Sequence, residues 1–247
     1  MKRNQKFVVI LIGPPGSGKG TQAGLLAEKL GLYSFETSRV LEESWVGANK
    51  NDYIETDGKK FYLLKEKKLF DEGKLCDPPF VAFMVEKKIR ELAGQGKGIV
   101  FSGSPRTVYE GKKLMPLLLK LYGKKNILVL ELKVSDKEAI WRNVRRKICS
   151  KCRYPVPYTK ETQKLTKCPK CGGLLVVRNL DTEKTMRVRL KEYKNRTYPL
   201  LDYFKKIGIP VKKINGEQSI ENVFEDILKV VSPLIKNQNS ANNKQAN

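Results

Sequence analysis

A glycine-rich segment at residues 13–21, with the sequence GPPGSGKGT, could bind phosphate groups. It follows an apolar run at residues 7–12 and precedes apolar residues at helical spacing, so it should join a buried strand to a helix. In that setting the loop N–H groups and the positive end of the helix surround an anion, and Lys19 reaches the β- and γ-phosphates of a nucleotide. Gly20 separates Lys19 from Thr21, whereas the general motif places Ser or Thr directly after the lysine. A turn that only joins a strand to a helix is the alternative interpretation.

Four of the five cysteines form two C-x-x-C pairs, Cys149 with Cys152 and Cys168 with Cys171. This spacing is typical of a tetrahedral zinc site, and four thiolates would fill all positions and give the ion a structural role. Two reducible disulfides or an iron–sulfur cluster are the alternatives. The fifth cysteine, Cys76, is expected mainly to pack in the interior.

The charge is strongly positive, with 49 Lys and Arg against 26 Asp and Glu, and histidine is absent. The absence of histidine excludes a Ser-His-Asp triad, a histidine relay and histidine metal ligands. The basic surplus predicts an anionic partner, although a solvated surface that serves solubility explains it equally well. The composition is that of a globular protein, with 40% hydrophobic and 30% charged residues.

Short apolar runs alternate with helical stretches along the chain, which favours a parallel sheet covered by helices. Besides residues 7–12, the strand candidates are residues 33–36, 99–101, 127–132 and 209–214. Segments 38–83 and 147–180 interrupt the alternation and are expected to be insertions. Segment 236–247 is almost wholly polar, so we expect it to be disordered.

The chain start superficially resembles a signal peptide, but its apolar run is short and no small-residue cleavage site follows. No apolar stretch approaches the roughly 20 residues that span a bilayer. We therefore expect a cytoplasmic protein with reduced cysteines that does not insert into a membrane.

Further motifs give the chain a family resemblance over nearly its whole length. The loop with Gly20 between Lys19 and Thr21 is similar to that of the nucleoside monophosphate kinases, adenylate kinase in particular. Residues 103–107, GSPRT, resemble the family motif G-F-P-R-T with Ser104 in place of the aromatic residue, and residues 73–77 resemble the turn that closes the monophosphate-binding subdomain.

The resemblance implies an α/β fold, a P-loop three-layer sandwich with a five-stranded parallel sheet flanked by helices. Residues 1–37, 84–146 and 181–235 would form the core domain. Two mobile subdomains would be inserted in it, a monophosphate-binding one at 38–83 and a zinc-binding lid at 147–180.

The resemblance also assigns site residues. Those implied for ATP are Gly13, Gly16, Ser17, Gly18, Lys19, Gly20, Thr21, Arg142 and Arg146. Those implied for the monophosphate are Thr37, Arg39, Lys74, Cys76, Gly103, Arg106, Glu110, Arg178 and Arg189. Those implied for catalysis are Lys19, Arg106, Arg146, Arg178 and Arg189. Phosphoryl transfer mainly requires alignment of the two nucleotides and neutralisation of charge, which arginine forks provide well.

Four positions depart from the family pattern. Glu42 stands at an arginine of the acceptor site, and Arg39 one turn earlier could compensate for it. Ser102 replaces an aspartate that helps to hold Mg²⁺, and Leu180 replaces an acidic residue, with Asp181 beside it. Glu110 replaces the glutamine that pairs with adenine, and its hydrogen-bonding capacity suits guanine better.

The expected activity is that of an adenylate kinase, ATP plus AMP giving two ADP, with Mg²⁺ accompanying ATP, structural Zn²⁺ in the lid, and a monomeric protein. One alternative is a kinase of the same fold that prefers GMP or a pyrimidine monophosphate. Another is an inactive nucleotide-binding relative that binds nucleic acid, which the basic charge favours. Aromatic residues, at 9%, do not alternate with a basic stripe, so we do not expect nucleic acid as a partner.

Overall fold

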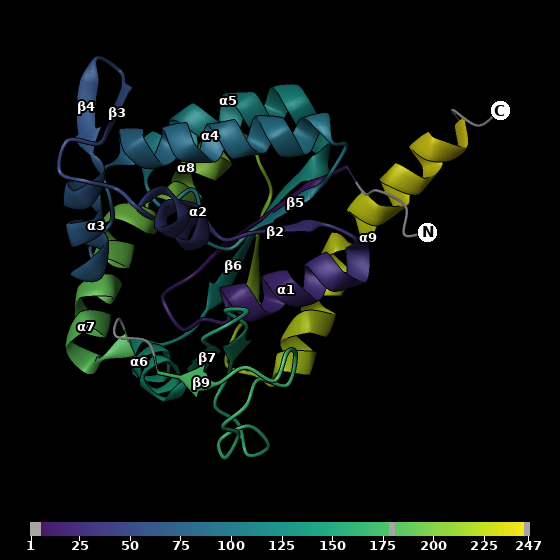
Figure 1. The fold of residues 1–247 in the computed structure, drawn as a ribbon. Coiled ribbons are helices and arrows are strands. Elements are labelled where there is room, and N and C mark those ends of the chain that lie inside the picture. Colours follow the sequence, from purple (N-terminus) through teal and green to yellow (C-terminus); the bar gives the residue numbers. More distant parts are fainter. Residues whose placement is uncertain (1–5, 178–180, 245–247) are drawn as a thin grey trace.

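The structure is a computed structural model that describes residues 6–177 and 181–244, with the backbone alone for residues 237–244. Its elements form three layers, with helices on both faces of a central sheet (Figure 1). Within the described residues, no helix has the length and apolar character that crossing a membrane requires.

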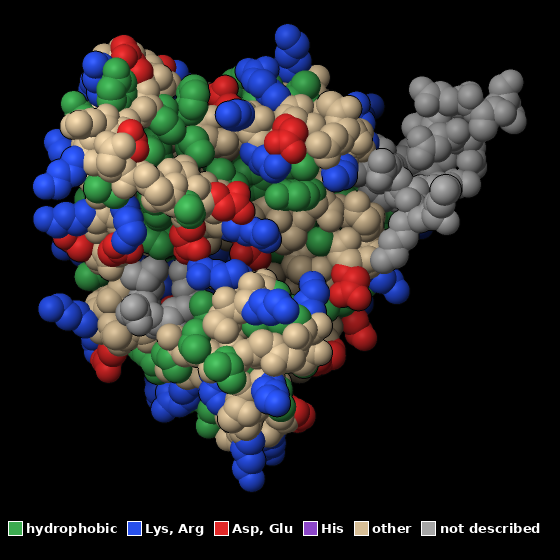
Figure 2. All heavy atoms as spheres, in the orientation of Figure 1, with side chains coloured by type: hydrophobic (Ala, Val, Ile, Leu, Met, Phe, Trp, Pro, Cys, Tyr) green, Lys and Arg blue, Asp and Glu red, His purple; other side chains and the backbone are tan. Residues whose placement is uncertain are grey.

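Lysine and arginine side chains are spread over many elements of the surface. In the face shown in Figure 2, they alternate with acidic and apolar groups and do not gather in one continuous stripe. Many of them pair with a neighbouring carboxylate on the same helix, as Lys67 does with Asp71 and Lys88 with Glu91. On this face, the basic surplus therefore forms a mixed, solvated surface.

Five parallel strands form the central sheet, in the order β10-β6-β1-β5-β2. This confirms the predicted fold class. In chain order the strands are β1 (Val8–Ile12), β2 (Tyr33–Phe35), β5 (Ile99–Phe101), β6 (Ile127–Lys133) and β10 (Val211–Asn215).

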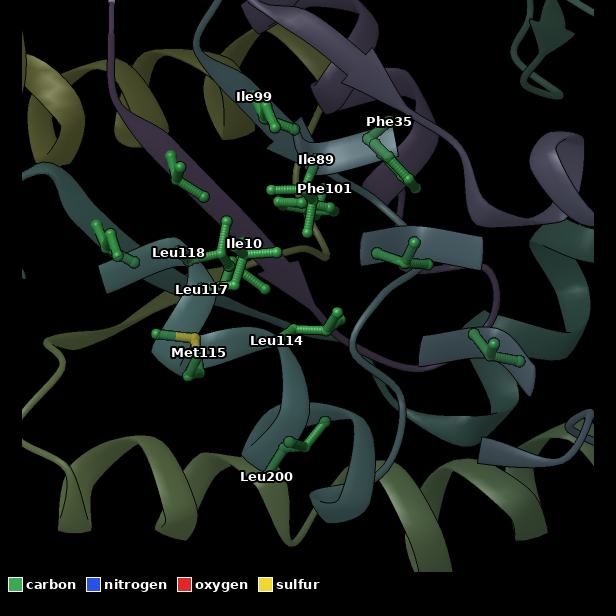
Figure 3. Close-up of a cluster of buried hydrophobic side chains, with 14 of the residues drawn as sticks. Ile10, Phe35, Ile89, Ile99, Phe101, Leu114, Met115, Leu117, Leu118 and Leu200 are labelled. Carbon is green, nitrogen blue, oxygen red and sulfur yellow. The ribbon is translucent and has the colours of Figure 1, made fainter. Parts of the chain in front are cut away.

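The apolar run at β1 is continuous because both faces of the sheet are covered. Val8, Ile10 and Ile12 face one hydrophobic cluster, part of which is shown in Figure 3, while Val9 and Leu11 face the other. The first cluster packs under α4 (Pro78–Gly94), α5 (Val108–Tyr122) and α8 (Leu200–Lys206), and the second under α1 (Lys19–Leu30) and α9 (Ile220–Lys244).

Two more helices and two single helical turns belong to this part of the chain. They are α6 (Asp136–Arg145), α7 (Glu183–Glu192), the 3₁₀ turn η1 (Lys124–Asn126) and the π-helical turn η3 (Tyr193–Thr197).

The two interrupting segments contain small sheets of their own. In the first, α2 (Thr37–Ser44) leads to the antiparallel hairpin of β3 (Tyr53–Thr56) and β4 (Lys59–Tyr62), which α3 (Leu63–Asp71) follows. In the second, β7 (Lys147–Cys149) pairs with β8 (Pro155–Val156) and with β9 (Leu175–Val176). We call residues 147–177 the cysteine segment.

The polar segment after residue 235 differs from the expectation of disorder. The backbone of α9 continues to Lys244, and its end projects beyond the layers (Figure 1). A helix satisfies its own backbone hydrogen bonds, so it can continue past Leu234, the last buried side chain among those that the structure describes. Residues 245–247 lie outside the described residues.

Candidate active site

The glycine-rich loop lies between β1 and α1, as the sequence predicts, and it is packed against α6. Gly16 has a φ angle of +88°, and a Cβ atom there would lie 2.4 Å from the Ala139 carbonyl oxygen and 2.2 Å from Asn143 Nδ2. Asn143 is fully buried and donates from Nδ2 to that carbonyl at 2.9 Å. Only glycine fits at this position, because α6 closes directly over the loop.

Lys19 folds back onto the loop that precedes it. Its Nζ atom donates to the carbonyl oxygens of Gly13 at 2.7 Å and Pro14 at 2.8 Å. Burial, followed by the positive charges of Arg106, Arg189 and Arg146, holds the pKa of Lys19 well below its usual value. An anionic phosphate would offset this electrostatic cost, so the arrangement is suited to binding one.

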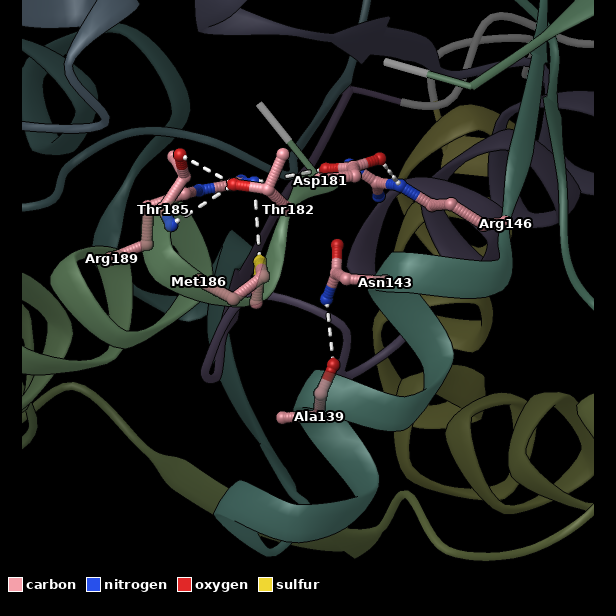
Figure 4. A network of polar contacts seen from close by, with 8 residues as sticks. All are labelled: Ala139, Asn143, Arg146, Asp181, Thr182, Thr185, Met186 and Arg189. Atoms are coloured by element: carbon pink, nitrogen blue, oxygen red, sulfur yellow. Dashed lines mark hydrogen bonds and ion pairs between the residues drawn. The ribbon is translucent and has the colours of Figure 1, made fainter. Parts of the chain in front are cut away.

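Asp181 holds two of these arginines, as Figure 4 shows. Its Oδ2 accepts from Arg146 Nε at 2.6 Å and its Oδ1 from Arg146 Nη2 at 2.9 Å, while Arg189 Nη1 lies 3.3 Å from the same Oδ1. The Asp181 side chain has no exposed surface, whereas the two arginines keep 24% and 21% of theirs. The carboxylate therefore fixes both guanidinium groups and leaves part of each accessible.

Arg106 belongs to the turn between β5 and α5. Burial lowers its pKa. A Cβ atom on Gly103 would lie 3.1 Å from Thr37 Oγ1 and 3.2 Å from Arg106 Nη2, so these three residues meet closely. Thr37 Oγ1 is buried and has no hydrogen-bond partner among the described residues, which leaves it available to a ligand.

Glu110 holds this turn together. Its Oε2 accepts from the Ser104 hydroxyl and from the Arg106 backbone N–H, both at 3.0 Å, and its Oε1 accepts from the Thr107 hydroxyl at 3.0 Å. Thr107 Oγ1 in turn accepts from the Glu110 N–H, which caps α5. Burial nevertheless raises the pKa of Glu110. The sequence suggested a carboxylate facing a base, but the structure directs both of its oxygens to the turn.

One central cavity of about 530 Å³ is lined by Lys19, Thr37, Arg106, Arg146 and Arg189. All the residues implied for ATP line it, as do five of those implied for the monophosphate: Thr37, Lys74, Gly103, Arg106 and Arg189.

Three residues implied for the monophosphate lie elsewhere. Cys76 and Glu110 border an adjoining cavity of about 20 Å³. Arg39 borders neither cavity, because its exposed side chain pairs with Glu43 at 3.1 Å. Arg178 lies outside the described residues.

The four paired cysteines converge, with all their Sγ atoms within 4.8 Å of one another. Sγ of Cys149 lies 3.4 Å from that of Cys171, and Sγ of Cys152 lies 3.7 Å from that of Cys168. A tetrahedral zinc ion with Zn–S bonds of about 2.3 Å requires separations of about 3.8 Å, so the set fits zinc. Within the cluster, backbone N–H groups, that of Cys152 foremost, lower the pKa of Cys149 to about 6. At Cys152, a backbone hydrogen bond at Tyr154 lowers the pKa, but hydrogen bonds with Cys171 and the other thiols outweigh it and raise the pKa.

Comparison with known proteins gives the same family in each case. The family model for adenylate kinase matches residues 11–209. The chain is 34% identical to an adenylate kinase of Methanothrix thermoacetophila over 91% of this chain and 98% of the relative. It is 34% identical to one of Archaeoglobus fulgidus, over 89% and 95% of the two chains, and 31% identical to one of Chlamydia pneumoniae, over 91% and 97%.

The chain belongs to the adenylate kinase family. It is therefore a phosphotransferase, a nucleoside monophosphate kinase, and its four-cysteine cluster is that of the zinc-lid type. In this adenylate kinase family member, Ser102 stands where the family pattern has an aspartate. It lines the cavity, and its hydroxyl donates to the Phe35 carbonyl oxygen at 3.3 Å. Leu180 lies outside the described residues.

Sequence reasoning missed several residues of this adenylate kinase site. Asp181 was noted only as a neighbour of Leu180, although its position shortly before an arginine-rich helix was a signal. Trp141 and Tyr158 line the cavity with their rings 5.7 Å apart, and Arg153 lines it from the cysteine segment. No sequence pattern indicated these three, because they come together only when the cysteine segment packs over α6.

Proposed function

We propose that this protein is an adenylate kinase that transfers the γ-phosphoryl group of Mg²⁺-bound ATP to AMP. The bond between the γ-phosphorus and its bridging oxygen would break as an AMP phosphate oxygen bonds to that phosphorus, which yields two ADP. The observation that carries the proposal is the convergence of Lys19, Arg106, Arg146 and Arg189 on one cavity, close enough to lower the pKa of the lysine.

The donor and acceptor would bind at opposite ends of this cavity. We assign the donor phosphates to residues 13–21 together with Arg142 and Arg146. Arg142 is held by Glu138 at 2.7 Å and by the Gly216 carbonyl oxygen at 2.8 Å, so its guanidinium group is positioned before a ligand binds. We assign the acceptor to Thr37, Lys74, Gly103, Arg106 and Arg189, and, from the sequence resemblance alone, to Arg178.

Catalysis would rest on alignment and on neutralisation of charge. Lys19, Arg106, Arg146 and Arg189 surround the position where the transferred group must pass. Because their charges already repel one another, bound phosphates stabilise them, and they would offset the negative charge on the phosphate oxygens as the transferred group passes from donor to acceptor. An ionised acceptor phosphate needs no general base.

Mg²⁺ would accompany ATP in this site and neutralise part of the phosphate charge. Magnesium retains several waters and is held largely by phosphate oxygens, so few protein ligands are needed. The Thr21 and Ser102 side chains line the cavity and could contact its hydration shell, so the residues present fit the ion. The zinc ion would fold the cysteine segment and take no part in the transfer.

We further propose that residues 38–83 and 147–180 are mobile subdomains that close over the two nucleotides, on a core of residues 1–37, 84–146 and 181–235. Their separate small sheets support this division. We also propose a monomer in the cytoplasm, where thiols stay reduced and available to zinc. Nucleic acid remains an unsupported partner, because the charges on the visible face are mixed (Figure 2).

A nucleotide panel tests the function. Purified protein with Mg²⁺ and ATP is offered AMP, GMP, CMP or UMP, and diphosphate formation is followed by chromatography. We expect AMP to give the highest kcat/KM. A preference for GMP or a pyrimidine monophosphate would replace the acceptor assignment, and no diphosphate from any acceptor would overturn the proposed function.

A further inference from the structure

An ion pair joins the cysteine segment to α2 across the active-site cavity. Arg153 Nη2 pairs with Oε2 of Glu42, two residues that are 111 positions apart in the sequence. The side chains keep 46% and 29% of their surface exposed, so the pair is partly screened from solvent. Arg153 lines the cavity, and Thr37, at the start of the same helix as Glu42, lines it too.

The backbone at Arg153 has an unusual conformation. Its φ angle is +63°, in the left-handed region that favours glycine. Among the described residues, only one other non-glycine residue has a positive φ, Asp57, which forms an Asp-Gly turn in the β3–β4 hairpin where this conformation is ordinary. Arg153 has no such turn sequence, since Tyr154 follows it. Gly172, which follows the second C-x-x-C pair as Arg153 follows the first, has a φ angle of +71°, so the turn after each pair adopts this conformation and Arg153 stands where glycine would fit without strain.

The cysteine cluster fixes this conformation. The Arg153 N–H donates to the Cys149 carbonyl oxygen at 3.1 Å, and the Cys149 N–H donates to the Tyr154 carbonyl oxygen at 3.0 Å. The turn that carries two of the zinc ligands therefore also aims the Arg153 side chain at α2.

Glu42 is the residue of α2 with which the Arg153 side chain pairs. Two further acidic residues flank it nearby, Glu36 before the helix and Glu43 within it, and Glu43 is paired with Arg39 on the outside. Glu42 instead meets the cysteine segment. The helix α2 begins at Thr37 and carries Leu41, and both residues border the adjoining small cavity. A contact that holds Glu42 in place therefore also holds the acceptor side of the site.

We propose that Arg153 is a positioning residue for the acceptor nucleotide: by pairing with Glu42 it holds α2 against the cysteine segment and completes the acceptor side of the cavity. The inference rests on the proposed function. The donor phosphates bind to the loop between β1 and α1, which this pair does not touch. Loss of the pair should therefore weaken the binding of AMP and leave that of ATP nearly unchanged.

A double-mutant cycle tests the pair. We expect Glu42→Gln and Arg153→Gln each to raise KM for AMP about threefold to fivefold, the range for a partly exposed ion pair, with KM for ATP changed less than about twofold. The two substitutions together should raise KM for AMP by less than the product of their separate effects, because each of them removes the Arg153–Glu42 pair. Arg153→Lys should recover part of the loss. Lys151→Gln, which removes an exposed charge from the same turn, should leave both KM values unchanged.

Arg153→Gly separates this role from a structural one. Glycine prefers the observed φ, so the variant should be at least as heat-stable as the parent while its KM for AMP rises as in Arg153→Gln. Multiplicative effects of the two glutamine substitutions, or KM values for AMP that stay at the parent level while ADP is formed, would overturn the positioning role alone. Absence of ADP from the parent protein would instead refute the proposed function.

Discussion

Ser104 donates its hydroxyl hydrogen to Oε2 of Glu110, with 3.0 Å between the two oxygens. Both residues depart from the family pattern, and the structure shows that the two departures are linked. The hydroxyl that replaces an aromatic ring supplies a hydrogen bond to the carboxylate that replaces an amide. Together they hold the turn that carries Arg106, whose backbone N–H binds the same oxygen.

Removal of this hydroxyl should destabilise the turn. Ser104→Ala leaves a buried carboxylate with one donor fewer, so we expect the free energy of unfolding to fall by about 1–3 kcal/mol. Glu110→Gln should also lower it, because an amide has one oxygen to replace two acceptors. The measurement is chemical denaturation of both variants and of the double variant, whose effect should be less than the sum. In Glu110→Gln the ratio of kcat/KM for AMP to that for GMP should change by less than about threefold, and a larger change would show that Glu110 reads the base.

Lys19→Met should abolish transfer and preserve the fold. We expect kcat to fall about a thousandfold, because the variant loses a charge at the reacting phosphates. Burial and three arginines lower the pKa of Lys19, so its charge costs stability in the ligand-free protein, and the variant should unfold at the same or a higher temperature. Lys29→Met, an exposed position on the same helix, is the matched control. Retained turnover in Lys19→Met would contradict the site assignment.

Asp181→Asn should affect both stability and turnover. The fully buried carboxylate pairs with Arg146 and Arg189, and the substitution removes its negative charge from two arginines that lie close to Lys19. We expect the free energy of unfolding to fall by about 3 kcal/mol, with a clear loss of kcat as the two guanidinium groups are released. Asp202→Asn, which removes an exposed partner of Lys205, should change stability by less than about 1 kcal/mol. Equal effects of the two substitutions would argue against the role of Asp181.

Zinc should be bound and should stabilise the fold. Elemental analysis of the purified protein is expected to find one zinc ion per chain, and a strong chelator should lower the melting temperature. Cys168→Ser should lose the metal, whereas Cys76→Ser should retain it, because Cys76 is buried away from the cluster and burial raises its pKa to about 12. Iron or no metal in the parent protein would exclude the zinc assignment.

Glu66 should make stability depend on pH. Its side chain is 2% exposed and accepts from the Asp77 N–H at 2.8 Å, and burial raises its pKa from 4.5 to about 7. The native state therefore binds more protons than the unfolded chain between these values, so this group's contribution to stability falls as the pH rises from about 4.5 to about 7 and is constant above. Glu66→Gln removes this titration and should gain stability relative to the parent as the pH rises. Thermal unfolding of both proteins from pH 5 to pH 8.5 measures it, and parallel curves would contradict the expectation.

Much of the fold followed from the sequence, and parts of the site did not. The strand runs and the loop with Lys19 were predictable because they depend on periodicity and on adjacent residues. The sequence suggested that Glu110 faces a base, whereas the structure shows that it binds Ser104 and Thr107. These partners could not be predicted because they depend on the three-dimensional path of the turn. Arg39 was expected at the acceptor site, but its position on the outer side of α2 pairs it with Glu43 instead.

The sequence by itself determined the phosphate loop, the alternation of strands and helices and the two C-x-x-C pairs, since each is set by neighbouring residues along the backbone. Only the tertiary structure decided that Asp181 bridges Arg146 and Arg189 and that Arg153 reaches Glu42. Those relationships depend on where separate elements meet and on how strongly burial there penalises an unpaired charge. Such penalties arise only when distant segments exclude water together.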